Sequence, residues 1–285
     1  MLARRKLPLA VVTMVYNEAV LLPVWLRHYG RQVGSKHCYV LDDGSSDGST
    51  RNIPARVFHL ARAQPDENRR AIIANEFCAG LLEGYHHVLF TDVDELVVAD
   101  PGRAPTLKHW VAWNRKLPPV VSPFGVDLLH DHENEREIDW AKPISKQRKL
   151  IRPFSALCKP TLVSEKPNWG AGFHFTQHVT KAYIGELYLF HLAFCDNRML
   201  EDRQLRRNAV AKDKPVMDHH GIPPSALLRH VQGYVQSLPR TGSRLGSGEF
   251  FFECTKRMFA ANLNNRELVQ AEELWELPKR FRGAF

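Results

Sequence analysis

The chain has 285 residues, which is enough for one large domain or two small ones with a sizeable core. A hydrophobic content of 44% and a charged content of 25% are those of an ordinary globular protein and argue against a disordered or fibrous chain. Lys and Arg outnumber Asp and Glu by 39 to 31, and the resulting net charge of +8 suits either an anionic partner or simply a basic surface.

Cysteines and apolar runs indicate the compartment. The five cysteines are scattered and form no CxxC pair, which argues against a disulfide framework or a structural zinc site. No window approaches 18 uninterrupted apolar residues, so no membrane span is expected. The basic and then apolar start of the chain is interpreted as a first strand rather than as a signal peptide. We therefore expect a cytoplasmic protein, with peripheral contact at the inner face of a membrane left open.

The first 98 residues alternate between strand and helix patterns. Apolar β-branched runs predict strands, and apolar residues at helical spacing predict helices. Asn17 is a candidate cap for the first helix, and Gly84 suits the end of the second. In chain order the expected elements are a strand at 9–15, a helix at 19–30, strands at 37–41 and 56–60, a helix at 69–82 and a strand at 87–90. This alternation favours a parallel sheet flanked by helices.

Three polar clusters follow three of these strands. They are the segments YNE at 16–18, DDGSSDGS at 42–49 and DVDE at 92–95. In open α/β sheets, ligands gather outside the carboxyl ends of the strands. The sequence therefore predicts that the functional site lies at this edge of the sheet.

The rest of the chain is less regular. Residues 120–129 contain a strand interrupted by Pro and Gly, residues 186–194 form a strong strand, and residues 198–212 form a charged helix. Helical patches and Gly/Ser loops alternate in the tail. We expect two halves of one domain, at 1–120 and 121–200, and a helical extension at 201–285.

The acids at 92–95 raise the sharpest chemical question. Along an extended backbone, Asp92 and Asp94 would point to the same side, where two like charges repel unless a cation lies between them. Such a pair could bind Mg²⁺ or Mn²⁺, perform covalent phosphoryl chemistry or cap the next helix. Asp42 and Asp43 could accept hydrogen bonds from a nucleobase or ribose, or could belong to an acidic surface turn.

Taken together, these segments resemble a known family. VVTMVYNEAVLLPVWLRHYGRQVG, CYVLDDGSSDGST and HVLFTDVDELVV are similar to the nucleotide-sugar domain of glycosyltransferases with the GT-A fold, within the family 2-like group. The match is clearest over 9–98, continues weakly through FG, CKPTLVSEKPNWGAGFHF and LFHL, and leaves about the last 80 residues uncovered. It implies an α/β fold with a GT-A-like, Rossmann-type mixed central sheet flanked by helices and a largely helical C-terminal extension. By this resemblance, residues 1–120 would be the nucleotide-sugar-binding half and residues 121–200 the acceptor-binding half of the same domain.

The resemblance also implies residue roles. Donor binding would fall to Met14, Tyr16, Asn17, Asp42, Asp43 and Arg70. A divalent cation, Mn²⁺ or Mg²⁺, would be held by Asp92, Asp94 and His174, with His191 as the second choice for the histidine. The implied donor is a nucleotide-sugar, with a UDP-sugar favoured over a GDP-sugar, and the acceptor would be a glycan or a lipid-linked glycan. No nucleic acid partner is implied.

The implied chemistry is transfer of the sugar with inversion. A bound cation would neutralise the charge that develops on the leaving diphosphate. A carboxylate general base would activate the acceptor hydroxyl. Asp127 and Glu165 are the candidates for that base, and Glu95 is expected to orient the site or meet the acceptor. The alternatives are a haloacid-dehalogenase-like phosphatase and a non-enzymatic basic protein that binds RNA or glycan.

Overall fold

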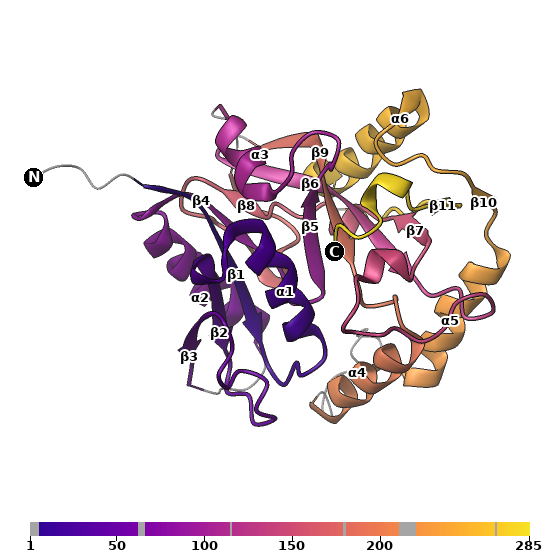
Figure 1. Ribbon diagram of the computed structural model, residues 1–285, viewed down its shortest axis with the longest axis horizontal. Coiled ribbons are helices and arrows are strands. Elements are labelled where there is room, and N and C mark those ends of the chain that lie inside the picture. Colours follow the sequence, from indigo (N-terminus) through magenta and orange to yellow (C-terminus); the bar gives the residue numbers. More distant parts are fainter. Residues whose placement is uncertain (1–5, 62–65, 115, 179–180, 211–220, 266) are drawn as a thin grey trace, which may run out of the picture.

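The computed structural model describes residues 6–61, 66–114, 116–178, 181–210, 221–265 and 267–285 (Figure 1). Its strands are β1 (Leu7–Val15), β2 (Cys38–Asp42), β3 (Arg56–His59), β4 (Tyr85–Phe90), β5 (Glu95–Ala99), β6 (Val120–Leu129), β7 (Leu150–Pro153), β8 (Leu162–Val163), β9 (Lys181–His191), β10 (Arg240–Thr241) and β11 (Leu274–Glu276). Its α-helices are α1 (Leu21–Val33), α2 (Glu67–Leu81), α3 (Leu107–Trp113), α4 (Asn197–Val210), α5 (Pro224–Ser237) and α6 (Gly248–Phe259). No described helix is both long and apolar enough to cross a bilayer.

All of these strands join one sheet. Its order is β10-β11-β7-β6-β8-β4-β1-β2-β3, and β9 pairs with both β5 and β6. The pairs β1–β2, β1–β4 and β2–β3 are parallel, whereas β7 and β8 run antiparallel to their neighbours. The expected mixed α/β sheet flanked by helices is confirmed, and its GT-A-like character stays a prediction.

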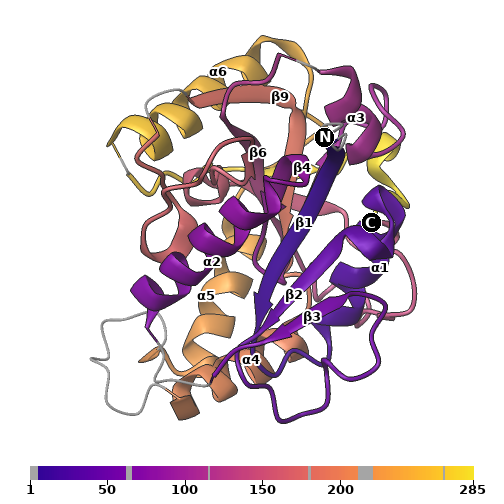
Figure 2. The same ribbon diagram turned by 90° about the vertical axis from the view of Figure 1, so that its left-hand side faces the viewer.

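Alternating side chains of β1 bury both faces of the sheet. Leu9, Val11 and Val15 pack with the apolar face of α1, whereas Ala10, Val12 and Met14 pack with α2. Figure 2 shows α1 and α2 on opposite sides of β1, β2 and β3. A strand buried on both faces is apolar throughout, which is why β1 shows no polar alternation in the sequence.

Two local expectations were wrong. Asn17 does not cap α1, which begins at Leu21 after Val20 and has no side-chain cap. The strand at 120–129 is not interrupted by its Pro and Gly; β6 is continuous, and only its register with β9 shifts, between Ser122 and Phe124. Strand β6 pairs with β7 in antiparallel and with β9 in parallel orientation. These ladders hold β6 in place although Pro123 has no N–H to donate.

The C-terminal part is largely helical, as expected, and it also contributes to the sheet. Strand β10 lies between α5 and α6, and β11 follows α6. Strand β11 pairs with β10 and with β7. In Figures 1 and 2, α4 lies beyond the carboxyl ends of β1 and β2. The division into a donor half, an acceptor half and an extension stays a prediction.

Gly125 on β6 is predicted to be essential for packing. A Cβ at this position would lie 2.3 Å from the backbone of Leu157, so Gly125→Ala forces the two segments apart. We expect the free energy of unfolding to fall by about 1–3 kcal/mol or more, as for other overpacked cores. Urea unfolding measures this change.

Gly233→Ala is the matched control. Gly233 lies in α5 with no atom within 4 Å of its added Cβ, so alanine there raises stability by roughly 0.5–1 kcal/mol. Equal effects of the two substitutions would contradict the packing argument.

Candidate active site

The three polar segments meet at one edge of the sheet. The Asp43 amide donates to the carbonyl of Val15 at 2.9 Å, and the Thr91 amide donates to the carbonyl of Val12 at 3.1 Å. Asn17 joins the first segment to the second, because its Oδ1 accepts from the amide of Ser46 at 2.8 Å. Since β1, β2 and β4 are parallel, the loops that follow them come together as the sequence predicted.

Helix α1 fixes the acid-bearing segment. The Trp25 indole donates to Thr91 Oγ1 at 3.0 Å, and His28 Nε2 donates to the carbonyl of Val97 at 2.9 Å. Tyr29 accepts from the amide of Val97 and donates to the carbonyl of Glu95. Trp25 and His28 therefore have a structural role, since they hold residues 91–97 in one position.

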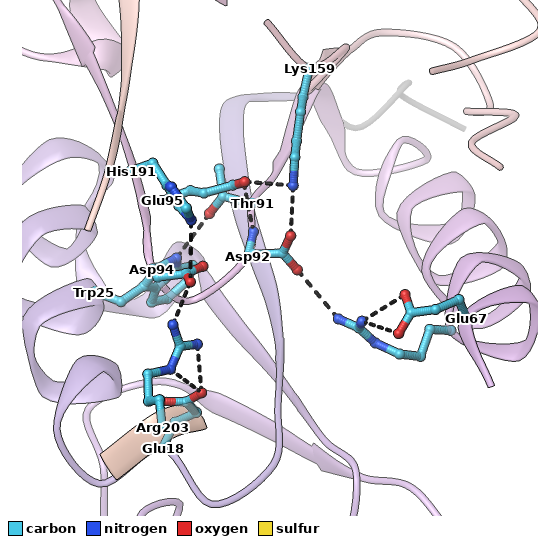
Figure 3. Close-up of polar contacts among 11 residues, drawn as sticks. Glu18, Trp25, Glu67, Thr91, Asp92, Asp94, Glu95, Lys159, His191 and Arg203 are labelled. Atoms are coloured by element: carbon cyan, nitrogen blue, oxygen red, sulfur yellow. Dashed lines mark hydrogen bonds and ion pairs between the residues drawn. The ribbon is translucent and has the colours of Figure 1, made fainter. Parts of the chain in front are cut away.

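Two cations neutralise Asp92. The Lys159 ammonium donates to Asp92 Oδ2 at 2.8 Å and lies 2.5 Å from Glu95 Oε1 (Figure 3). Arg70 donates to Asp92 Oδ1 at 3.3 Å and is itself held by Glu67. Burial opposes the charge on Asp92, but Lys159 and Arg70 outweigh it and lower its pKa. For Glu95 burial prevails over Lys159 and raises the pKa.

Asp94 has a separate set of partners. Arg203 from α4 binds Asp94 Oδ2 through Nη1 at 2.5 Å and binds Glu18 Oε1 through Nη2 at 2.8 Å. Figure 3 shows Arg203 between these two acids. Burial would favour the neutral acid, but Arg203 and then His191 keep the pKa of Asp94 well below its usual value. This contact ties the loops after β1 and β4 to α4.

Strand pairing explains how His191 reaches the site. In the β5–β9 ladder His191 lies opposite Glu95, and in the β6–β9 ladder it lies opposite Asp127. Its Nδ1 donates to Asp127 at 2.7 Å, and its Nε2 lies 3.5 Å from Asp94. Burial opposes protonation of the ring, but the two carboxylates prevail and raise the pKa of His191 to about 10.

The expected donor-binding residues lie at the same edge. Asp42 is buried, and its oxygens accept from the amide of Ser45 and from Thr50, so it organises its own turn. Asp43 is paired with Arg69 at 3.1 Å. Tyr16 is 37% exposed at the rim, whereas the Met14 side chain is buried against α2.

In the described conformation, the residues expected to bind a metal ion do not form a metal site. They contain no group of three His, Cys, Asp or Glu side chains arranged to hold a metal ion. Asp92 and Asp94 have suitable oxygen ligands, but each is occupied by its own cations. Two unit charges 4 Å apart interact by about 4 kcal/mol at an effective dielectric of 20, so a divalent ion beside Arg203 would be repelled by about twice that.

Neither candidate histidine is arranged as a ligand. His174 Nδ1 donates to the carbonyl of Ala156 at 2.8 Å, and among the described contacts no hydrogen bond or ion pair joins its ring to Asp92 or Asp94. Desolvation and the charge of Lys159 lower the pKa of His174 to about 4, although Asp92 acts weakly in the opposite direction. Both nitrogens of His191 face carboxylates. The predicted ligands Asp92, Asp94 and His174 therefore stay a prediction that the ion pairs do not favour.

The three candidate catalytic carboxylates differ in access. Asp127 is 1% exposed and lies behind His191, and Glu95 is 2% exposed beside Lys159. Glu165 is exposed, but no described contact joins it to the acids. Direct proton transfer from an acceptor to Asp127 or Glu95 would require an opening of the site. The identity of the base stays a prediction.

Sequence reasoning missed the cations. In the sequence, Lys159 is part of the segment CKPT, and Arg203 is part of a charged helix. Neither carried a signal of its own, because Lys and Arg are common on exposed surfaces. Only the fold brings them to the acids.

Comparisons with known proteins add little to this picture. The chain matches no family model and no curated protein. Among solved structures it is similar to a mannosyltransferase from Pyrobaculum calidifontis in complex with GDP-Man and Mn²⁺, with 15% identity, a TM-score of 0.38 and coverage of 90% of this chain and 75% of that one. A mannose-1-phosphate geranyltransferase from Thermus thermophilus has 11% identity, a TM-score of 0.30 and coverage of 95% and 73%. Likenesses this weak carry no argument about reaction or ligands.

The raised pKa of His191 predicts a pH dependence of stability. Its protonated form stabilises the folded state fully below the unfolded pKa of about 6.5, and this contribution is lost as the pH rises toward the folded pKa of about 10. The stability advantage of the wild type over His191→Gln should therefore shrink with rising pH, by up to about 1.4 kcal/mol per unit.

Urea unfolding at several pH values between about 6 and 10 measures this advantage. His86→Gln, at an exposed position on β4, is the control for the loss of a histidine side chain without a described ion pair. A difference for His191→Gln that stays constant would contradict the ion pairs with Asp94 and Asp127.

Proposed function

We propose that this protein is a glycosyltransferase that moves a sugar from a nucleoside-diphosphate donor to an acceptor hydroxyl, with inversion at the anomeric carbon. One observation carries the proposal: the loops after three parallel strands meet at one edge and combine the acidic turn at 42–49 with a dense cluster of charge. In open α/β sheets this edge is where nucleotides bind. The resemblance of the same three segments to donor-binding motifs supports the same assignment.

The nucleoside would bind between the first two loops. Tyr16 presents a partly exposed ring that can stack on a base, and Asp43 lies at the end of β2 within reach of ribose hydroxyls. Asp42 would shape the turn through its own hydrogen bonds rather than contact the donor. The base stays open between uracil and guanine, with a UDP-sugar as the first expectation.

The acceptor would approach the diphosphate end of this edge. A glycan or a lipid-linked glycan is the acceptor class that we propose, and peripheral contact with a membrane surface would suit the net charge of +8. An attacking hydroxyl must reach the anomeric carbon on the face opposite the leaving group, which is the geometric origin of inversion.

Nucleoside-diphosphate binding tests the proposal. A ligand that binds only the folded state at about 100 times its Kd adds about 2.7 kcal/mol of stability, which corresponds to roughly 5 °C in melting temperature for a chain of this size. We expect such a shift with UDP or GDP. Asp43→Asn should weaken the binding about tenfold, while Asp47→Asn, an exposed residue of the same turn, should not.

Release of sugar from the donor gives a second readout. Chromatography should detect slow hydrolysis of the matching nucleotide-sugar to free sugar and nucleoside diphosphate in the absence of an acceptor. No thermal shift with any common nucleoside diphosphate, either with Mn²⁺ or with EDTA, would refute the donor assignment.

A further inference from the structure

The acids of the DVDE segment are already neutralised by side chains of the protein. Asp92 binds Lys159 and Arg70, and Asp94 binds Arg203. These contacts are largely shielded from water, since the side chains of Lys159 and Arg203 are 6% and 9% exposed. Ion pairs with so little access to water are costly to separate, because each freed charge would remain buried. The acids are therefore arranged to hold cations in fixed positions.

Within the described part of the chain, Arg207 is a cation without an acid of its own. It lies one helical turn after Arg203 on α4 and therefore on the same side of the helix. Among the residues that the structure describes, no carboxylate forms an ion pair with Arg207. Burial and Arg203 lower the pKa of Arg207. The more weakly acting acids Asp94, Glu18 and Asp92 offset this lowering of the pKa only in part. An anion bound beside Arg207 would therefore stabilise its charge.

Arg70 approaches the acids from the other side. It belongs to the first turn of α2, its guanidinium lies 5.4 Å from the ring of Phe173, and its side chain is 27% exposed. In Figure 3, Glu67 of α2 and Arg203 of α4 lie on different sides of the two aspartates. Arg70 from α2 and Arg207 from α4 both act electrostatically on Asp92, so the two guanidiniums belong to the surroundings of the same acids.

We infer that the donor's diphosphate is bound by Arg207 and Arg70, and that these fixed cations, backed by Lys159 and Arg203, replace a divalent metal ion in stabilising the leaving group. The inference rests on the proposed function and adds the residues that bind the diphosphate. Asp92 and Asp94 are then positioning residues, which hold the cations rather than a metal. Arginine suits this task because its planar fork binds phosphate oxygens in pairs.

The transfer step balances without a further reactant. The bond between the anomeric carbon and the diphosphate oxygen breaks, and its electron pair stays on that oxygen. A bond forms from the acceptor oxygen to the anomeric carbon, and the acceptor proton leaves to a base or to water. The nucleoside diphosphate thus gains one negative charge, and preorganised cations stabilise that charge as it develops.

Calorimetric titration with UDP and GDP tests this inference. With the wild type, the affinity of the nucleotide that binds should be the same within about threefold in excess EDTA and in Mn²⁺. Arg207→Gln should weaken that affinity at least tenfold, the loss expected for one charge-assisted contact to phosphate. The affinity for the corresponding nucleoside, uridine or guanosine, should be unchanged, because it lacks the diphosphate.

Arg206→Gln is the matched control. Arg206 precedes Arg207 on the same helix but is exposed, so its loss removes the same charge without the proposed contact. Circular dichroism and melting curves check that both variants are folded, and the comparison of EDTA with Mn²⁺ needs no variant at all.

The possible outcomes separate the two proposals. Binding that disappears in EDTA and returns with Mn²⁺ would overturn this inference and leave the proposed function standing. Equal losses in Arg206→Gln and Arg207→Gln, or no loss in either, would overturn the role of Arg207. Absence of binding in both EDTA and Mn²⁺ would overturn the proposed function itself.

Discussion

The ion pair between Asp94 and Arg203 is the contact on which the rest of the site depends. It joins the loop after β4 to α4, and through Glu18 it also joins the loop after β1. A carboxylate and a guanidinium that are both largely buried stabilise the fold only while they remain together, since either one alone would be an uncompensated charge. The segment at 92–95 is therefore held in part by a helix that begins more than 100 residues later.

The sheet imposes a second constraint at the same place. The antiparallel β5–β9 ladder and the parallel β6–β9 ladder fix His191 between Glu95 and Asp127. Helix α1 holds the other side of the segment through Trp25 and Tyr29. A rigid shell of this kind preorganises charged side chains, so that a ligand meets them already oriented. The proposed glycosyl transfer would use such preorganisation, because a leaving diphosphate gains charge as its bond to the sugar breaks.

The sequence predicted the parallel half of the fold well and the site only in part. Apolar β-branched runs marked β1, β2 and β4, and the polar segments after them lie together as expected. Asn17 has the local propensity of a helix cap, yet its side chain accepts hydrogen bonds from residues 29 and 30 positions away. The partners of the two aspartates, Lys159 and Arg203, are 67 and 109 residues distant along the chain. No local pattern encodes such pairings, so the acids could be found from sequence and their neutralising cations could not.

A crystal structure with Mn²⁺ and the nucleoside diphosphate that binds would test the central claim most directly. Anomalous scattering at the manganese edge locates the metal independently of the protein. The account predicts that Asp92 keeps Lys159, that Asp94 keeps Arg203, and that the diphosphate lies against Arg70 and Arg207. A manganese peak at about 2.0–2.3 Å from oxygens of both aspartates, with Lys159 and Arg203 displaced, would contradict it.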